Sequence, residues 1–261
     1  MTPDPDSIRA ALPTFFLNAI CRMALNCLPS AMILTLLSSL LCAFIAAASE
    51  FSGVATLTSE YIYRGLEMSE GDPALQLGLD YEHDSGLFVG VWASTIDIRT
   101  AMGSRDTELD YYAGFHYAAT SPLTATVTLL RYSYPGQTGM HRYDYSEVLV
   151  NATWRDRYSM ELGYTSNLYG LDRIGRHWEL RTEWPVANAW VISAALGGND
   201  MSDASVSPYL HWNVGASTRL SRLTLDLRWY DNERPDGFAT QLSASSQLVL
   251  SISTAFLIDI Q

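Results

Sequence analysis

Apolar and polar residues alternate one by one in the stretch from Ala74 to Ser94. On a β-strand, side chains two positions apart share a face. The pattern therefore predicts a strand that lies between an apolar and a polar environment. A soluble β-sandwich provides this where two apolar faces meet, and a transmembrane β-barrel provides it where the apolar face contacts lipid. The apolar face would carry Leu75, Leu77, Leu79 and Tyr81, and the polar face Gln76, Gly78, Asp80 and Glu82.

The same alternation recurs after Phe51 in segments of about ten residues, and no amphipathic helical stretch interrupts them. It is clearest at residues 108–117, 158–165, 177–184 and 223–230. The connections between the segments fall into two classes that alternate strictly along the chain. Short connections lie at 83–86, 119–122, 155–157, 185–188 and 221–222, and longer polar ones at 65–73, 99–107, 135–142, 170–175, 198–206 and from 232 onward.

Five short and six long connections join twelve strands, an even number that places both ends of the sheet on the short-turn side. Outer-membrane barrels have this plan, with tight periplasmic turns and longer external loops. A soluble sandwich has no physical reason to separate its connections by length. We therefore expect an all-β fold, a transmembrane antiparallel up-and-down β-barrel of about twelve strands behind an N-terminal signal peptide. A soluble sandwich or a lipocalin-like binder is the structural alternative.

Many aromatic residues fall near the ends of the predicted strands. In a transmembrane barrel, such residues form girdles at the two lipid–water interfaces. The aromatic core of a soluble β fold is the competing interpretation. The candidates for the girdles are Tyr61, Tyr63, Trp92, Tyr132, Tyr134, Trp154, Trp178, Trp184, Trp190, Trp212 and Trp229.

Residues 31–48 form an uncharged apolar stretch that follows Arg22 and ends in small residues before Ser49. This is the pattern of a secretory signal peptide, and it predicts cleavage after Ala48. A transmembrane helix is the competing interpretation, because 18 residues reach the lower limit for a span. We expect two parts, an N-terminal extension with the signal peptide at 1–48 and an outer-membrane barrel at 49–261. The cysteines, Cys21, Cys27 and Cys42, all precede the cleavage site, so the barrel would hold no disulfide and no cysteine zinc site.

The formal net charge is −12, and the sequence contains no lysine. An acidic chain lacks the basic face that a nucleic-acid partner requires. If the polar faces point inward, acidic side chains outnumber basic ones in the lumen, and such a lumen attracts cations and repels anions. The predicted lumen-lining residues are Asp80, Glu82, Glu108, Asp110, Arg131, Glu147, Glu161, Glu179, Arg181, Glu183, Asp226 and Arg228.

These residues predict a porin for the passive diffusion of small cationic or neutral solutes. The alternative is an occluded structural or ligand-binding barrel, because small barrels are filled by their own side chains. Hydrolysis is a weaker alternative: His141 and Asp144 are the nearest match to an omptin-like pair, but no spacing is diagnostic. His177 and Glu179 share a strand face, yet two ligands do not make a metal site. We expect no enzymatic activity, no metal and no cofactor.

The segment LTSEYIYRGLEMSEGDPALQLGLDYEHDSGLFVGVWAS at 57–94, with LDYYAGF at 109–115, carries the most specific motif of the chain. Its characteristic positions are Thr58, Ser59, Tyr61, Arg64, Gly65, Asp72, Pro73, Ala74, Gln76, Gly78, Asp80, Tyr81 and Gly90 to Trp92. These residues resemble a proteobacterial family of outer-membrane porins, the TorF-type or Gcw_chp-domain proteins, and the resemblance extends less specifically to Phe256.

The resemblance implies a pore in the bacterial outer membrane, without established catalytic residues. It implies outer-membrane lipid, the barrel-assembly machinery and small solutes as partners. Such barrels commonly end in an aromatic residue, whereas here five residues follow Phe256.

Overall fold

The computed structural model describes residues 49–100, 103–120, 122–139, 141–187, 189–201, 206–236, 242 and 246–258. The predicted signal peptide, its cleavage after Ala48 and the three cysteines fall on residues 1–48 and lie outside the described residues.

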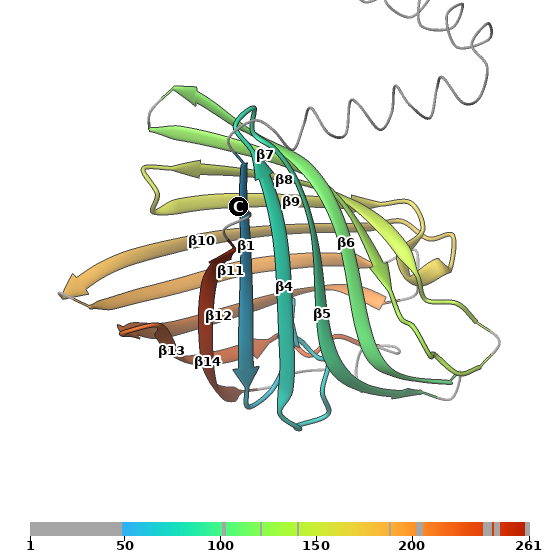
Figure 1. Cartoon of the computed structure of the whole chain (residues 1–261). Helices are drawn as coiled ribbons and strands as arrows, with labels where there is room; N and C mark the ends of the chain where they lie inside the picture. The colour runs from blue at the N-terminus through green and yellow to red at the C-terminus, as the bar shows by residue number, and fades with distance from the viewer. Residues whose placement is uncertain are drawn as a thin grey trace, which may run out of the picture. The chain divides into compact units, whose positions relative to one another are not determined.

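Twelve antiparallel strands close into one barrel, as the sequence predicts (Figure 1). Each strand pairs with the next wall strand in chain order, and β1 closes the sheet against β14, with Phe51 opposite Ile258. Two short strands, β2 (Ile62–Tyr63) and β3 (Leu66–Glu67), form a separate hairpin. The wall consists of β1 (Ser49–Thr58), β4 (Ala74–His83), β5 (Leu87–Thr100), β6 (Gly103–Thr120), β7 (Leu123–Ser133), β8 (Tyr145–Trp154), β9 (Tyr158–Thr165), β10 (Gly175–Ala187), β11 (Trp190–Met201), β12 (Val206–Leu220), β13 (Leu223–Asn232) and β14 (Gln247–Ile258).

The connections sort to the two ends of the barrel, as predicted. One end, the short-turn end, carries the tight turns together with the start of β1 and the end of β14. The other end, the loop end, carries the remaining connections. Two connections that were expected to be long are mostly strand, because β5 and β6 pair as far as Thr100 and Gly103 and β11 continues to Met201. The polar residues there extend the sheet, since the backbone ladder forms whatever side chains it carries.

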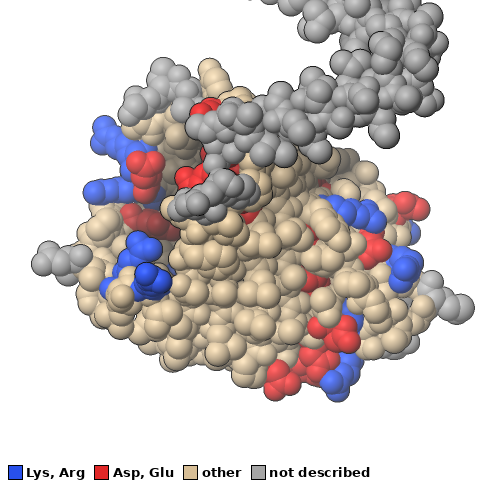
Figure 2. All heavy atoms as spheres, viewed as in Figure 1, with Lys and Arg blue, Asp and Glu red and all other residues tan. Residues whose placement is uncertain are grey.

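The outward faces of the wall are apolar over most of the strand length. Leu77 of β4 is 51% exposed, and outward residues such as Val127, Leu162 and Leu227 are exposed to a similar extent. On the face shown in Figure 2, charged side chains gather toward two margins and an uncharged expanse lies between them. Such a surface is favourable in contact with lipid, and a closed sheet leaves no unpaired backbone edge within it. Among the described residues, no helix is long and apolar enough to cross a membrane.

The predicted aromatic girdle is confirmed at the short-turn end. Trp154, Tyr158 and Trp184 pack in a row on the outer face, with neighbouring ring centroids 5.6 and 5.7 Å apart. Trp154, Trp184 and the nearby Trp190 are all exposed. Further along the wall, Trp178, Trp212 and Trp229 share the outward faces of Leu180, Val214 and Leu227.

The girdle prediction is wrong for Tyr61, Tyr63, Trp92, Tyr132 and Tyr134, because these rings lie inside the barrel at the loop end. Tyr132 and Tyr134 are each only 2% exposed, and Tyr61 packs against Trp92 inside the barrel, with ring centroids 5.6 Å apart. These rings belong to a hydrophobic core that fills the loop end from within. Its buried members are Leu66, Met68, Ile96, Ile98, Tyr132, Tyr134, Tyr143, Tyr145, Leu168, Met201, Val206 and Tyr209, and Tyr61 and Tyr63 pack against them.

Candidate functional site

The connection between β1 and β4, residues 59–73, folds into the barrel, and we call it the inward hairpin. Within it, β2 and β3 pair with Tyr63 opposite Leu66. The two residues between the strands, Arg64 and Gly65, have φ angles of 50° and 77°. Positive φ at both central positions is the mark of a type I′ turn, whose twist matches that of a two-residue hairpin. The turn places the side chain of Arg64 at the tip.

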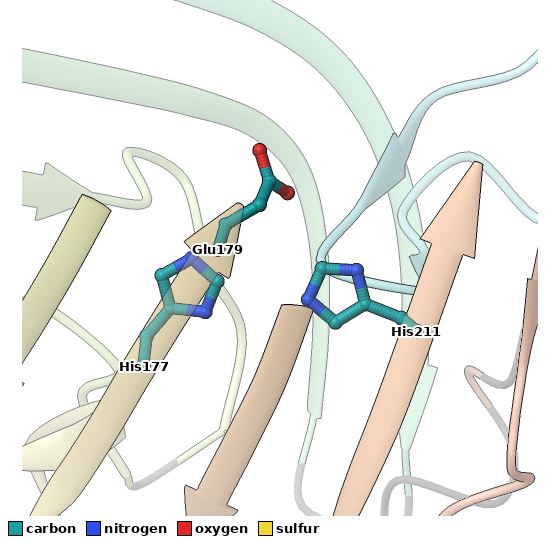
Figure 3. A group of neighbouring side chains, drawn as sticks. All are labelled: His177, Glu179 and His211. Atoms are coloured by element: carbon teal, nitrogen blue, oxygen red, sulfur yellow. The ribbon is translucent and has the colours of Figure 1, made fainter. Parts of the chain in front are cut away.

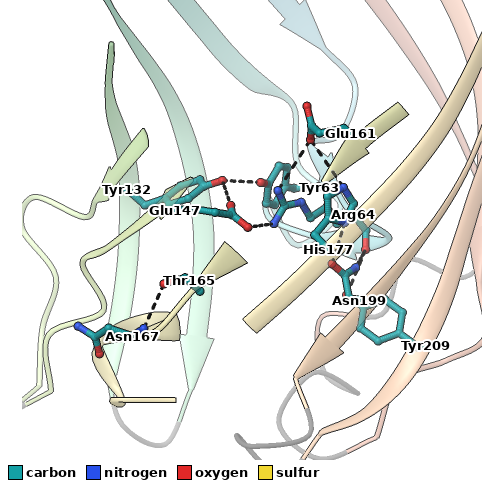
Figure 4. Close-up of polar contacts among 10 residues, drawn as sticks. All are labelled: Tyr63, Arg64, Tyr132, Glu147, Glu161, Thr165, Asn167, His177, Asn199 and Tyr209. Atoms are coloured by element: carbon teal, nitrogen blue, oxygen red, sulfur yellow. Dashed lines mark hydrogen bonds and ion pairs between the residues drawn. The ribbon is translucent and has the colours of Figure 1, made fainter. Parts of the chain in front are cut away.

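An ion pair joins the tip to the far wall (Figure 4). Arg64 Nη1 donates to Glu147 Oε1 on β8 at 3.0 Å, and Arg64 Nη2 lies 4.0 Å from Glu161 Oε1 on β9. The side chains of Arg64 and Glu147 are only 12% and 2% exposed. Removing one partner of a buried pair leaves an unpaired charge, at a cost of about 3–5 kcal/mol. The pair therefore holds the hairpin strongly in place.

Wall side chains also hold the backbone of the tip. The carbonyl oxygen of Arg64 accepts hydrogen bonds from Asn199 Nδ2 at 3.3 Å and from the hydroxyl of Tyr209 at 3.1 Å (Figure 4). The carbonyl oxygen of Gly65 accepts one from Asn232 Nδ2 at 2.5 Å. These bonds come from β11, β12 and β13 on one side of the wall, whereas the ion pair reaches β8 and β9 across the lumen from the junction of β1 and β4.

Close packing completes the fit of the tip. A Cβ atom on Gly65 would lie 2.7 Å from the Cβ of His211, so only glycine allows this approach at its positive φ. The hydroxyl groups of Tyr63 and Tyr132 are 2.6 Å apart, and the Tyr132 hydroxyl donates to Glu147 Oε2 at 2.8 Å. The tip and the wall thus share one hydrogen-bonded network.

The base of the inward hairpin holds two acidic side chains, Glu60 and Glu67. Burial raises the pKa of Glu60 to about 8, and a hydrogen bond with Glu67 and repulsion from its charge act in the same direction. Near neutral pH, Glu60 therefore binds a proton that its unfolded counterpart would release. Docking of the hairpin is linked to pH through this proton.

A cavity of about 360 Å³ lies between the hairpin tip and strands β9 to β13. Two of its arginines are paired with neighbours two positions away, Arg181 with Glu179 at 2.7 Å and Arg228 with Asp226 at 2.9 Å. Its charged lining consists of Arg64, Glu161, Glu179, Arg181, Glu183, Asp226 and Arg228. The cavity is therefore highly polar but locally almost balanced in charge.

Eleven of the twelve predicted lumen-lining residues lie on the inward faces of their strands. Asp80 accepts a hydrogen bond of 2.6 Å from the hydroxyl of Tyr112, which faces it from β6. Glu108 and Asp110 are buried at the loop end, where Glu108 Oε1 accepts a bond of 3.2 Å from the Tyr134 hydroxyl. The cavity brings together Glu161, Glu179, Arg181, Glu183, Asp226 and Arg228, while Asp80, Glu82, Glu108, Asp110 and Glu147 lie on the inward wall outside it.

Arg131 is the exception, because β7 places it on the outward face. It alternates with the buried Tyr132 and shares the exposed face of Leu129, and its Nη1 lies 3.5 Å from Ser146 Oγ on the outer surface. Leu129 and Leu130 are adjacent apolar residues, so alternation alone does not fix the orientation of this strand end. Here the interior is a packed apolar core, and the polar residue faces outward.

The inward hairpin and the role of Arg64 are not predicted by strand alternation. The composition of the connection between β1 and β4 indicates that it packs inside the barrel, because it carries Leu66 and Met68 among polar residues. A loop in water gains nothing from these side chains, whereas burial of each contributes roughly 1.5–3 kcal/mol. Both are buried in the core inside the barrel.

The two residues considered for hydrolysis take part in loop structure. His141 Nε2 lies 2.8 Å from the carbonyl oxygen of Tyr169. Asp144 Oδ1 accepts hydrogen bonds from the backbone N–H of Tyr134 at 2.9 Å and from Gln137 Nε2 at 3.2 Å. Their partners are groups that hold the loop together.

The closed sheet, its apolar outer belt and its polar interior define a β-barrel of the bacterial outer membrane. The chain belongs to the family described as "bacterial protein of unknown function (Gcw_chp)", whose model matches residues 43–258. No curated protein matches the sequence.

Solved structures with a similar barrel are outer-membrane channels. The KdgM porin in complex with disordered oligogalacturonate has a TM-score of 0.49 and 9% identity, over 81% of this chain and 100% of that chain. The NanC porin has a TM-score of 0.48 and 10% identity, over 80% and 99% of the two chains. A deletion mutant of the TodX monoaromatic hydrocarbon channel has a TM-score of 0.48 and 12% identity, over 84% and 92%. These likenesses concern the shape of the barrel alone.

Proposed function

We propose that this protein is a porin of the TorF type, a passive channel for small cationic or neutral solutes whose narrowest section is set by the inward hairpin. The observation that carries the proposal is the polar cavity of about 360 Å³ enclosed by a lipid-facing wall. A barrel with a purely structural role would be more stable with an apolar interior, because buried charges are costly to desolvate. This barrel keeps charged side chains in contact with a cavity instead.

The preference for cations rests on the inward faces as a whole. Nine predicted carboxylates face inward, against Arg181 and Arg228 of the same set, Arg64 of the hairpin and the buried Arg105 at the loop end. Arg64, Arg181 and Arg228 each pair with a carboxylate at 3.0 Å or less, and Arg105 packs over the Tyr143 ring, 3.9 Å from its centroid. Of the remaining carboxylates, Asp80, Glu82 and Glu183 lie outside the buried core of the loop end, and they give the lumen a negative potential, which low-dielectric walls focus along the axis.

Planar-bilayer recordings under a salt gradient test this function. The full chain, purified in detergent from the outer membranes of an expressing Gram-negative cell, is expected to give discrete steps with a cation-selective reversal potential. Glu183→Gln removes a cavity charge that has no arginine within ion-pair distance among the described residues, and it is expected to shift the reversal potential toward zero. Asp156→Asn removes the same charge from an exposed turn at the short-turn end, outside the cavity, and is the matched control. Anion selectivity would contradict the proposal.

An occluded barrel is the second candidate, and the inward hairpin favours it. The hairpin spans the lumen and joins a hydrophobic core at the loop end. A folded protein that gives no steps, while variants with an undocked hairpin conduct, would establish this second candidate.

The N-terminal residues complete the proposal. We propose that residues 1–48 direct secretion and are removed after Ala48, and that the barrel-assembly machinery then inserts residues 49–261. N-terminal sequencing of the membrane-inserted protein tests this, and a first residue other than Ser49 would contradict the cleavage site.

A further inference from the structure

Two histidines and a carboxylate converge on the lumen beside the hairpin tip (Figure 3). His177 and Glu179 lie on β10, and His211 lies on β12. Their nearest donor atoms all lie within 4.8 Å of one another. Only the pair on β10 is visible as a sequence motif, because His211 joins it through the register of the sheet.

A glycine between the two strands makes room for the cluster. On β11, Gly197 stands opposite both Glu179 and His211 in the sheet register. A Cβ atom at this position would lie 2.4 Å from His211 Nε2. Any side chain at position 197 would displace the imidazole of His211. Glycine therefore lets a ring nitrogen of His211 face Glu179.

The hydrogen bonds of Asn199 determine which nitrogen of His177 is free. Asn199 Nδ2 donates to the carbonyl oxygen of Arg64, which is only an acceptor, so Asn199 Oδ1 faces His177. His177 Nδ1 lies 3.1 Å from that oxygen and must donate to it. In the neutral imidazole, Nε2 then carries the lone pair, and it points into the lumen 3.7 Å from Glu161 Oε1. An oriented second-shell partner of this kind is typical of histidines that bind metals.

His211 supplies an independent sign that a ligand is expected. The residue is only 3% exposed, and its Nε2 has no hydrogen-bond partner within the described part of the chain. A buried polar nitrogen without a partner is costly. An ion bound by this nitrogen would satisfy it.

We propose that His177, Glu179 and His211 bind one divalent transition-metal ion of the Zn²⁺ class inside the barrel. Two imidazoles and a carboxylate suit such ions better than Mg²⁺ or Ca²⁺, which prefer oxygen ligands. Bonds of about 2.1 Å require donor atoms about 3.0–3.5 Å apart, so small side-chain rotations complete the geometry. The charge of the nearby Arg64 is already compensated by Glu147 at 3.0 Å. The site goes beyond the proposed diffusion of solutes and does not depend on it.

Calorimetric titration of the full-length protein in detergent tests the site. The protein is purified without a histidine tag, stripped with a chelator and dialysed, and its fold is checked by heat-dependent gel mobility. We expect ZnCl₂ to bind with one ion per barrel and MgCl₂ to give no comparable binding. His211→Gln and His177→Gln are expected to weaken Zn²⁺ binding by at least about 100-fold, and Asn199→Ala by about 10- to 100-fold.

A matched control separates this site from adventitious binding. His116→Gln alters an inward-facing histidine on β6 that lies 2.9 Å from Thr126 Oγ1, outside the cluster, and it is expected to leave Zn²⁺ binding unchanged. Absence of Zn²⁺ binding by the folded protein would overturn the proposal. An equal loss of Zn²⁺ binding in the His116→Gln and His211→Gln variants would also overturn it. So would an affinity of the unaltered protein for Mg²⁺ equal to its affinity for Zn²⁺.

Discussion

Replacing Arg64 with alanine is the most direct test of what holds the inward hairpin in the lumen. The variant removes the 3.0 Å bond to Glu147 and leaves that carboxylate, whose side chain is 2% exposed, without its cation. The loss costs about 3–5 kcal/mol. Since about 1.4 kcal/mol changes an equilibrium constant tenfold, the ratio of docked to undocked hairpin falls roughly 10²- to 10⁴-fold. The bonds to the carbonyl oxygens of the tip remain available, because they involve the backbone.

Limited proteolysis measures this ratio, because cleavage follows the population of the undocked state when docking is faster than cutting. We expect proteinase K to cut within residues 59–73 at least about 100-fold faster in Arg64→Ala than in the unaltered protein. Planar-bilayer recordings of the same variant are expected to show a larger conductance. The double variant Arg64→Ala/Glu147→Gln should be cut more slowly than the single one, because it no longer buries an unpaired charge.

Arg173→Ala is the matched control, since Arg173 lies in an exposed connection at the same end of the barrel. A folded Arg64→Ala barrel whose hairpin is cut no faster than that of the Arg173→Ala barrel would refute the reasoning.

Three further predictions concern Glu60 and Gly65 of the inward hairpin and Gly90 of the wall. The pKa of Glu60 is about 8 in the docked hairpin against an ordinary 4.5, so docking is strongest below about pH 4.5 and weakens as the pH rises toward 8. Cleavage of the hairpin should therefore accelerate between pH 6 and 8. The variant Glu60→Gln should remove this pH dependence. Gly65→Val should undock the tip, because its Cβ would lie 2.7 Å from the His211 Cβ at a positive φ, and an increase in cleavage no greater than that of Gly71→Val would contradict this. Gly90→Val should lower the thermal unfolding temperature, because a Cβ there would lie 2.3 Å from the Tyr112 ring; an unchanged melting curve would count against that packing.

Alternation predicts the wall correctly wherever lipid lies outside and water inside. In β4 the apolar Leu77 and the polar Asp80 follow that rule. At the loop end of β7 the rule inverts, because the interior there is a packed apolar core. Arg131 therefore faces outward and Tyr132 inward, against the expectation. The physical boundary between these regimes is the point at which the interior of the barrel becomes a packed apolar core, which the alternation of a single strand does not mark.

The contacts of the candidate site depend on register, which residue spacing does not reveal. His177 and Glu179 are two positions apart and can be recognised together, but His211 reaches them only across β11. Arg64 and Glu147 likewise meet because a turn carries the arginine across the lumen. Pairings of this kind follow from the closed sheet and cannot be read from local pattern.

The position of the inward hairpin in the chain has a consequence for the order of folding. It follows the first wall strand, yet the residues bonded to its tip lie later in the chain, from Tyr132 to Asn232. The tip has no surface to bind until most of the wall has assembled, so its docking is a late and non-local step. Resistance of this segment to protease would therefore report that the barrel is finished, whereas insertion of the early strands alone would leave it open to attack.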